Sequence, residues 1–526
     1  MLKKHLGVAI VKKAIKKKGN ERAVRLAILI LALAFVFIFV YSPHFRNPYP
    51  IHIDEWQHIA QIISVSEGKA NWNPYFREGH ADLEIFFHGF WALFALLLGR
   101  QGFIMFCSFL PAVFAVLSGL MLFILVKRIT KRFSAALFSV LLFGSLKSSL
   151  NIIGIAYFTP LSMAIPLMFL FMLLFIEGIS ENSRKKLLLS AASFAALLLI
   201  HPPSATILLP AIIFYPVVCR KFFSKNRKAI LVSLSALALV FAASFFIKIG
   251  GRAASEILIS NLVFRLGWTG YELKYFLPFL FSIPATLLAV FGAYRSFDDE
   301  KSRFFLIFAL FTIAISMVFN RFNISILAPY QRVIYYSMIS LVPLAAIGLS
   351  ELYTLIKSQL ERKWSSIYPA MLSAATALLI LALVFTSKYP SAENISTDYA
   401  SPVLSASSER ALLWVSENYP KDYVVMAPVF TTSAVYPVSG NLVQSLLPAQ
   451  LGTFDRQDER ISDALSFYNS TNCSEQISIL DKWNVSIVLS SSEIRCFSPE
   501  FSSGLAGSEF ALAYDKGYFV YARKEI

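Results

Sequence analysis

Residues 26–41 read LAILILALAFVFIFVY, an unbroken apolar run that is followed, after SPHFRNPYP, by IHIDEWQHIA at residues 51–60. A helix that crosses a bilayer needs about 20 mainly apolar residues. Residues 25–42 therefore predict a first membrane span. Bulky residues follow it in place of a small-residue cleavage site, so we expect a retained signal anchor. The acidic pair Asp54 and Glu55 comes directly after this span.

The composition of the whole chain extends this prediction to a polytopic α-helical membrane protein. Of its 526 residues, 56% are hydrophobic and 15% are charged, and the apolar residues gather in long blocks. The blocks predict about eleven transmembrane helices, at residues 25–42, 103–126, 133–150, 157–177, 187–200, 203–219, 229–248, 275–294, 304–320, 331–354 and 367–387. A short amphipathic or re-entrant segment is also predicted at residues 83–98.

The distribution of Lys and Arg predicts how these spans are oriented, because cytoplasmic loops are enriched in both residues. Residues 1–24 form a basic tail, and basic clusters recur at every second loop, such as KRITKR at residues 127–132 and RKFFSKNRK at residues 220–228. We therefore expect a cytoplasmic N-terminus and an extracytoplasmic C-terminus, in a plasma membrane or an ER membrane. The net charge of +16 follows mainly from this bias. Nucleic acid is not an expected partner.

Residues 388–526 differ in sequence pattern from the apolar blocks before them and predict a small extracytoplasmic α/β domain. SSERALLWVSENYP is typical of a capped helix, and YVVMAPV, VSIVLS and YFVYAR are short β-rich runs. The membrane domain then covers residues 25–387, with a first outer loop at residues 43–102. Cys473 and Cys496 both lie in the outer domain, where a disulfide is able to persist. We favour that disulfide over two free thiols.

The first outer loop contains an unusual group of ionisable residues. At 100° per residue, residues 54–66 form a helix with Asp54 and His58 on its polar face and apolar residues opposite, which predicts an interfacial helix lying on the bilayer. The following segment adds three further ionisable residues at the membrane boundary: His80, Asp82 and Glu84. The predicted fold therefore has interfacial helices in this loop.

This arrangement resembles the GT-C superfamily, integral-membrane glycosyltransferases that use polyprenyl-phosphate-linked sugars. The resemblance rests on HIDE at residues 52–55 directly after the first span. HPPSATILLPAIIFY at residues 201–215 is similar to the His-Pro start of a middle span, and YQRVIYYSMISLVPLAAIGLSELY at residues 330–353 is similar to an Arg-bearing late span. The runs ALLWVSENYPKDYVVMAP, LDKWNVSIVLSS and FALAYDKGYFVYAR are similar to the outer domain that many members carry.

The resemblance implies an inverting transfer of a sugar from a polyprenyl phosphate to a lipid-linked glycan, a surface polymer or a protein. The phosphate is a good leaving group, so the chemistry needs a general base near the acceptor more than a general acid. The acidic pair of the family would supply that base. By this likeness Asp54 is the base, and Glu55 orients the acceptor or supports a metal.

Basic residues on the outer side are candidates for binding the donor phosphate. Arg332 is the first of these, because a charge within a span is costly and usually functional. The next candidates for binding the phosphate are Arg265 and Lys274, in a predicted outer loop. His201, at the outer end of a predicted span, is a further candidate. The other predicted substrate-binding residues are His58, His80 and Asp82, and membrane lipids are expected partners.

Two departures from the family pattern bear on the predicted metal site and on the predicted kind of transferase. The loop KSSLNIIGIAYFTP contains no carboxylate, whereas metal-dependent oligosaccharyltransferases place a second acidic motif there. A divalent metal such as Mg²⁺ or Mn²⁺ would then depend on Asp54, Asp82 and Glu84. The outer domain also has no WWDYG-like motif, which favours a transferase of single sugars over a protein N-glycosylating enzyme.

Two other classes of protein compete with the transferase. A polytopic transporter would show internal repeats and charged residues near the midplane of the bilayer. The sequence has no duplicated halves, and its polar residues gather at one face of the membrane instead. A non-catalytic assembly protein of a surface-glycan pathway is the third possibility.

Overall fold

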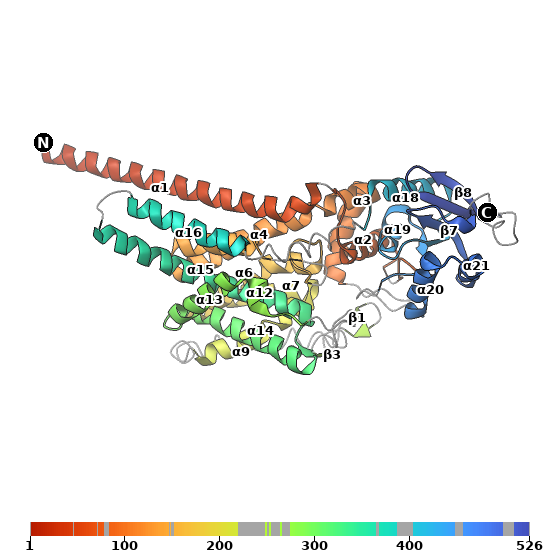
Figure 1. The fold of residues 1–526 in the computed structure, drawn as a ribbon. Helices are drawn as coiled ribbons and strands as arrows, with labels where there is room; N and C mark the ends of the chain where they lie inside the picture. Colours follow the sequence, from red (N-terminus) through yellow and green to blue (C-terminus); the bar gives the residue numbers. More distant parts are fainter. Residues whose placement is uncertain are drawn as a thin grey trace.

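The computed structural model describes the chain at residues 2–45, 47–70, 72–77, 84–146, 148, 152–218, 248–249, 252–253, 263–265, 274–363, 368–386, 403–447, 456–497 and 510–524. A bundle of long helices makes up one end of the molecule, and a mixed α/β unit with the C-terminus makes up the other (Figure 1). Helix α1 runs along the bundle and extends beyond it at the N-terminal end (Figure 1).

Among the described residues, six helices are long and apolar enough to cross a membrane. They are α1 (Leu2–Tyr41), α3 (Ile85–Cys107), α4 (Leu110–Thr130), α6 (Pro160–Ser180), α14 (Arg303–Phe322) and α15 (Tyr330–Lys363). Shorter helices lie between them: α5 (Phe133–Gly144), α7 (Arg184–Ile200), α8 (Pro202–Thr206), α9 (Leu209–Val218), α12 (Leu277–Phe281) and α13 (Ile283–Ser296). Helix α16 (Tyr368–Thr386) follows α15. The chain is a polytopic helical membrane protein, and eleven spans remain a prediction.

Most predicted spans coincide with helices, although residues 229–247 lie outside the described residues. The segment predicted as a short amphipathic or re-entrant piece is part of α3, which continues to Cys107. Gly99 interrupts this helix with φ 68° and ψ 169°, a conformation that glycine adopts without a steric cost. Because the apolar run resumes after the break, α4 starts at Leu110, later than the predicted span.

Helices α13 and α15 pack with their backbones in direct contact. A Cβ atom added to Gly292 would overlap the backbone oxygen of Leu344, and one added to Gly348 would overlap that of Leu288. Small residues at such crossings allow close packing, which drives helix association in membranes, where the hydrophobic effect contributes little. These two glycines fix the distance between α13 and the helix that bears Arg332.

Replacing Gly292 by Ala should destabilise the bundle, because no neighbouring side chain can move out of the way. Overpacking typically costs about 1–3 kcal/mol, and here the clash is with backbone. Gly89→Ala is the matched control, since its Cβ would meet nothing within 4 Å and alanine favours a helix by up to about 1 kcal/mol. Thermal unfolding in detergent should give a lower Tm for Gly292→Ala only. Equal Tm values would contradict the close crossing.

The predicted interfacial helix of the first outer loop is α2 (Ile53–Ser66), but it is enclosed by protein. Every residue from Glu55 to Ser64 is buried, including His58 of the predicted polar face. The reason is that α3 packs on one side and α19 (Thr432–Ser439), from the C-terminal unit, packs on another. The helical projection identified the two faces but not this second covering layer.

The C-terminal unit is built on a five-stranded sheet with the order β6-β5-β7-β9-β8. Strand β5 is parallel to β6 and β7, whereas β9 is antiparallel to β7 and β8. The strands are β5 (Val424–Met426), β6 (Leu442–Val443), β7 (Val485–Ser490), β8 (Phe510–Asp515) and β9 (Phe519–Arg523), and the other helices are α18 (Ala406–Asn418), α20 (Gln457–Asn469) and α21 (Cys473–Lys482). Cys473 and Cys496 form a disulfide, with Cα atoms 5.4 Å apart.

The first outer loop and the C-terminal unit share one hydrophobic core. Trp56 and Phe87 belong to the same buried cluster as residues of the sheet and of α19. The Tyr75 hydroxyl donates a hydrogen bond to the backbone oxygen of Ser433 at 2.7 Å, and the backbone N–H of Val443 donates to the oxygen of Tyr75 at 2.9 Å. The two parts therefore lie at the same end of the molecule.

Short strands complete the described chain. Strand β1 (Lys248–Ile249) pairs with β2 (Arg252–Ala253), and β3 (Val263–Arg265) pairs with β4 (Ile324–Ile326), which leads into α15.

Candidate active site

The N-terminus of α2 is held by a capping box in which a histidine takes the place of the usual Ser or Thr. The Nδ1 atom of His52 accepts the backbone N–H of Asp54 at 3.0 Å. Glu55 Oε2 accepts the backbone N–H groups of Ile51 and His52, both at 2.9 Å. A capping box satisfies donors that the first helical turn leaves unpaired, so this sequence fixes the direction in which Asp54 projects.

Glu55 also connects α2 to the bundle. Its Oε1 atom accepts the backbone N–H of Phe158, just before α6, at 2.7 Å, and its side chain is fully buried. Burial raises the pKa of Glu55 to about 7, against the opposing effect of the three backbone N–H groups. Both carboxylate oxygens thus bind backbone, and Glu55 joins two segments of the fold.

Asp54 forms an ion pair with Arg332, which lies near the start of α15. The Oδ2 atom of Asp54 is 3.6 Å from Nη2 of Arg332, and its Oδ1 atom is 3.7 Å from Nδ1 of His52. The Arg332 side chain is only 6% exposed and that of Asp54 is 19% exposed. The structure therefore brings the predicted base and the first predicted phosphate-binding residue into one ion pair.

The loop between α5 and α6 supports both partners of this pair. Arg332 Nη1 donates to the backbone oxygen of Ile153 at 3.1 Å, and the backbone N–H of Ile155 donates to the Tyr335 hydroxyl at 2.9 Å. A Cβ atom at Gly154 would overlap the ring of Tyr335, so only glycine fits there. Through Phe158 the same loop binds Glu55 of α2. Helices α2 and α15 are thus aligned by one segment.

His201 belongs to a hydrogen-bonded group beside Arg332. Its Nδ1 atom lies 2.7 Å from the hydroxyl oxygen of Ser204, which lies 2.7 Å from the hydroxyl oxygen of Tyr336. All three residues are buried, and Arg332 is near enough for its positive charge to interact electrostatically with His201. A histidine whose one ring nitrogen is fixed in this way presents the other in a defined direction.

A second group, His58, Glu84 and His88, has the character of a metal site. The Nδ1 atom of His58 is 3.1 Å from Nε2 of His88 and 3.8 Å from Oε2 of Glu84, and one candidate ligand atom from each residue lies within 4.8 Å of the others. Burial lowers the pKa of His58 well below its usual range, so the ring is neutral at pH 7 and keeps a lone pair for a metal. Two imidazoles and one carboxylate form a donor set that zinc uses in catalytic sites.

Comparison with the sequences of curated proteins finds no match. A model described as a family of unknown function (DUF6541) matches residues 86–471, which is more than half of the chain. The chain belongs to the DUF6541 family. The matched region includes His88, His201 and Arg332, whereas Asp54 and the rest of α2 precede it.

Solved structures show that this DUF6541 protein has the fold of GT-C glycosyltransferases, which confirms the predicted resemblance. The Archaeoglobus fulgidus oligosaccharyltransferase tethered to an acceptor peptide aligns at a TM-score of 0.61 and 14% identity, over 95% of this chain and 74% of that chain. The archaeal oligosaccharyltransferase AglB from A. fulgidus, in complex with an inhibitory peptide and a dolichol-phosphate, aligns at a TM-score of 0.59 and 13% identity, over 96% of this chain and 75% of that chain. ArnT from Cupriavidus metallidurans bound to undecaprenyl phosphate gives 0.55 and 12%, over 94% and 97%.

Four further site residues of the DUF6541 protein were predicted: His80, Asp82, Arg265 and Lys274. His80 and Asp82 lie outside the described residues. Arg265 ends β3, where it pairs with Ile324 of β4, and Lys274 is exposed before α12.

Sequence reasoning missed three residues of the site. His88 follows Glu84 by four residues, and Tyr336 follows Arg332 by the same interval, so each pair shares one face of a helix. Ser204 lies three residues after His201. Spacing was the available signal for all three.

Proposed function

We propose that this protein is an inverting glycosyltransferase that moves a sugar from a polyprenyl-phosphate donor to an acceptor on the outer face of the membrane. The ion pair between Asp54 and Arg332 is the observation that supports this function best, because it joins a base and an anion-binding cation in a largely buried position. The lipid phosphates bound by AglB and ArnT support a donor of the same class.

In the proposed reaction, Arg332 binds the phosphate of the donor, which replaces Asp54 as its partner. The freed carboxylate of Asp54 removes the proton of the acceptor hydroxyl while the acceptor oxygen bonds to the anomeric carbon. The bond between that carbon and the phosphate oxygen breaks, and the polyprenyl phosphate leaves with the electron pair. Attack opposite the leaving group inverts the configuration. A positioned base contributes about 10²–10⁴-fold to such a step.

The neighbouring residues position these two groups. Glu55 holds the first turn of α2 and does not itself react. His201, fixed by Ser204 and Tyr336, adds a hydrogen-bond donor beside Arg332 for the same phosphate. Groups that are already oriented stabilise developing charge without reorganisation at the moment of reaction.

A divalent metal fits the second group of the site. His58, Glu84 and His88 would hold it, and when bound it would supply further positive charge for a phosphate. The nitrogen donors favour zinc over Mg²⁺ or Mn²⁺, which prefer oxygen ligands. A complex of the A. fulgidus oligosaccharyltransferase with Zn and sulfate is among the similar structures, at 13% identity and a TM-score of 0.61 over 94% of this chain and 73% of that chain.

His88→Ala should therefore weaken zinc binding by more than about tenfold, since loss of even an outer partner of a metal ligand costs about 10–100-fold. Metal content after dialysis against buffered zinc, measured by mass spectrometry, tests this. His44→Ala is the control, because His44 is equally buried but bonds to the backbone oxygen of Tyr49 outside the group. Zinc content unchanged by His88→Ala would refute the site.

The orientation and the acceptor class are part of the same proposal. The basic N-terminal tail supports a cytoplasmic N-terminus, and the outer face then carries Asp54 and the C-terminal unit. The acceptor is a lipid-linked glycan, a surface polymer or a protein. The absence of a WWDYG-like motif from the sequence of residues 388–526 supports the transfer of single sugars.

The test uses the full-length protein in nanodiscs, incubated with a panel of undecaprenyl- and dolichyl-phosphate sugars and candidate acceptors. We expect donor consumption, release of polyprenyl phosphate and a product whose anomeric configuration, read by NMR, is opposite to that of the donor. Retained configuration would exclude the proposed single displacement. Solute flux in proteoliposomes without any turnover of donor would favour the transporter.

A further inference from the structure

The chain contains five Asn-X-Ser/Thr sequences in which X is not proline, the acceptor motif of N-glycosylation. They begin at Asn323, Asn394, Asn469, Asn472 and Asn484. With a cytoplasmic N-terminus, as proposed above, all five motifs lie on the outer side of the membrane. Asn394 lies outside the described residues. For the other four, the surrounding structure decides which asparagine a transferase can reach.

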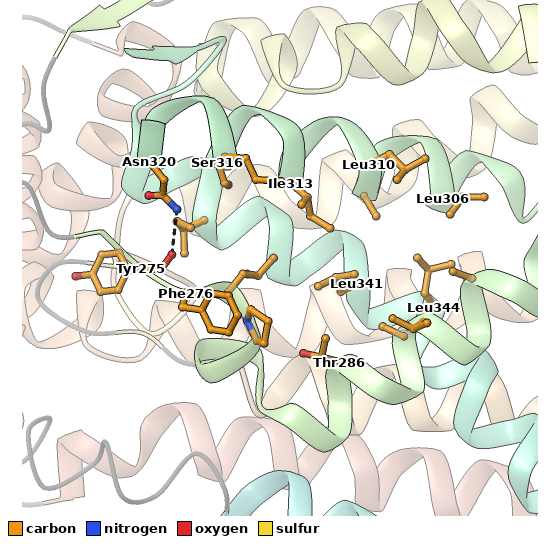
Figure 2. A pocket seen from close by; sticks show the side chains of 18 residues that line it. Tyr275, Phe276, Thr286, Leu306, Leu310, Ile313, Ser316, Asn320, Leu341 and Leu344 are labelled. Carbon is orange, nitrogen blue, oxygen red and sulfur yellow. Dashed lines mark hydrogen bonds between the residues drawn. The ribbon is translucent and has the colours of Figure 1, made fainter. Parts of the chain in front are cut away.

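The motif at Asn323 is part of a packed turn at the end of a membrane helix. Figure 2 shows Asn320, one turn earlier, at one end of an apolar pocket between α13, α14 and α15, with its side chain bonded to the backbone of Tyr275. Ser325 has no exposed surface, and its hydroxyl donates to the backbone oxygen of Ala328 at 2.6 Å. Because the motif requires this hydroxyl, a transferase cannot use it in the folded protein.

The motif at Asn484 runs directly into the sheet of the C-terminal unit. Val485 and Ser486 are the first two residues of β7, a strand that pairs with β5 on one side and with β9 on the other. Val485 has no exposed surface, and Ser486 is 9% exposed. The sheet would have to open before an enzyme could bind this motif.

The two remaining motifs share the short link between α20 and α21. Figure 1 shows these helices in the C-terminal unit, at the end of the molecule opposite the N-terminus of α1. Residues 469–474 read NSTNCS, so that the second motif starts directly after the first. Asn469, Thr471 and Asn472 are all exposed. Links of this kind tolerate modification, because few contacts depend on their side chains.

The hydrogen bonds of the second motif close it on itself. Asn472 caps α21, and its Oδ1 atom accepts the backbone N–H of Ser474 at 3.1 Å and the Ser474 hydroxyl at 2.7 Å. The residue between them, Cys473, is held by its disulfide to Cys496. The hydroxyl of this motif is therefore engaged within the motif, and its backbone is restrained at the middle residue.

The first motif has a more accessible arrangement. Asn469 is the last residue of α20, and the exposed Thr471 that completes its motif lies in the link, outside both helices. The nearby disulfide also indicates the compartment, since disulfides persist in oxidising environments outside the cytoplasm. Accessibility and compartment thus favour the same asparagine.

We propose that Asn469 carries an N-linked glycan, attached by a separate oligosaccharyltransferase of the host cell. The inference rests on the orientation given in the proposed function, and not on the transfer activity of this chain. The Nδ2 atom of Asn469 bonds to the anomeric carbon of a glycan carried by a polyprenyl phosphate or diphosphate. The bond from that carbon to the phosphate oxygen breaks, the lipid leaves with the electron pair, and a base of the host enzyme takes the amide proton.

Glycopeptide mass spectrometry of the full-length protein from its host membranes tests this proposal. After reduction and trypsin digestion, residues 461–482 form one peptide, in which fragmentation distinguishes Asn469 from Asn472. We expect a glycan on Asn469 and unmodified peptides at Asn323 and Asn484. Thr471→Val should remove the glycan although the asparagine is intact, whereas Thr471→Ser, which keeps the hydroxyl, should retain it.

Ser474→Ala is the matched control, since it destroys only the neighbouring motif at Asn472 and should leave the glycan in place. Thr471 is exposed, so neither of its variants should unfold the protein, which equal Tm values would verify. An unmodified peptide 461–482 from the wild-type protein would overturn the assignment, as would a glycan that Ser474→Ala removes and Thr471→Val does not.

The Asp54→Asn variant separates this modification from the chemistry of the chain itself. Its Asn469 should remain glycosylated, because another enzyme attaches the glycan. Loss of the glycan in this variant would overturn the separate transferase, since the chain would then modify itself. A glycan on Asn469 of a protein that transfers no sugar in nanodiscs would retain the modification site and reject the proposed function.

Discussion

Asp54→Asn should abolish sugar transfer while leaving the protein folded and able to bind its donor. The amide keeps the shape of the side chain and can still accept a hydrogen bond from Arg332, but it does not take a proton. Turnover should fall by about 10²–10⁴-fold, the usual contribution of a positioned base. The KM for the donor should not rise, because Arg332 loses a competing carboxylate.

Steady-state kinetics in nanodiscs separates these effects, since a loss of kcat without a rise in KM indicates an interaction made in the transition state. Asp422→Asn is the matched control, as Asp422 has a 70% exposed side chain in the C-terminal unit. A wild-type rate for Asp54→Asn would show that another group acts as the base.

Arg332→Gln should produce the second large loss, of about 10²–10³-fold in kcat/KM, because one preorganised donor to a developing charge is worth this much. Arg332→Lys should restore only part of it, since lysine lacks the planar fork that can bind Asp54 or a phosphate together with the oxygen of Ile153. The control is Arg321→Gln, an exposed arginine at the end of α14, which should keep wild-type kinetics.

Loss of stability could mimic this result, because removing one partner of a buried ion pair costs about 3–5 kcal/mol. The double variant Asp54→Asn with Arg332→Gln removes both charges and should recover most of the Tm lost by Arg332→Gln alone. Its activity should stay absent. If activity returned together with Tm, Asp54 would not be the base and Arg332 would not bind the phosphate, and both residues would have a structural role.

The sequence predicted individual residues of the site better than their arrangement. Asp54 stood out because it directly follows an apolar span, and Arg332 because a charge in a span is rare. Their meeting depends on the loop between α5 and α6, which binds both helices through backbone groups that have no sequence signature.

The role of Glu55 was also not predicted correctly from the sequence. The resemblance to the GT-C family implied that Glu55 orients the acceptor or supports a metal together with Asp54, yet neighbours on a helix point about 100° apart. The pattern of His52 followed three residues later by glutamate is that of a capping box, which would have indicated a buried, structural carboxylate.

The common core of α2 and the C-terminal unit means that the segment carrying Asp54 and the C-terminal unit are not separable modules. If this membrane bundle acquired the outer unit of another protein, Tyr75 would lose its partners at Ser433 and Val443, and α2 would lose the covering of α19. Recombination within the family would therefore have to transfer residues from both ends of the gene together. In that sense the C-terminal unit helps to hold the helix that carries Asp54.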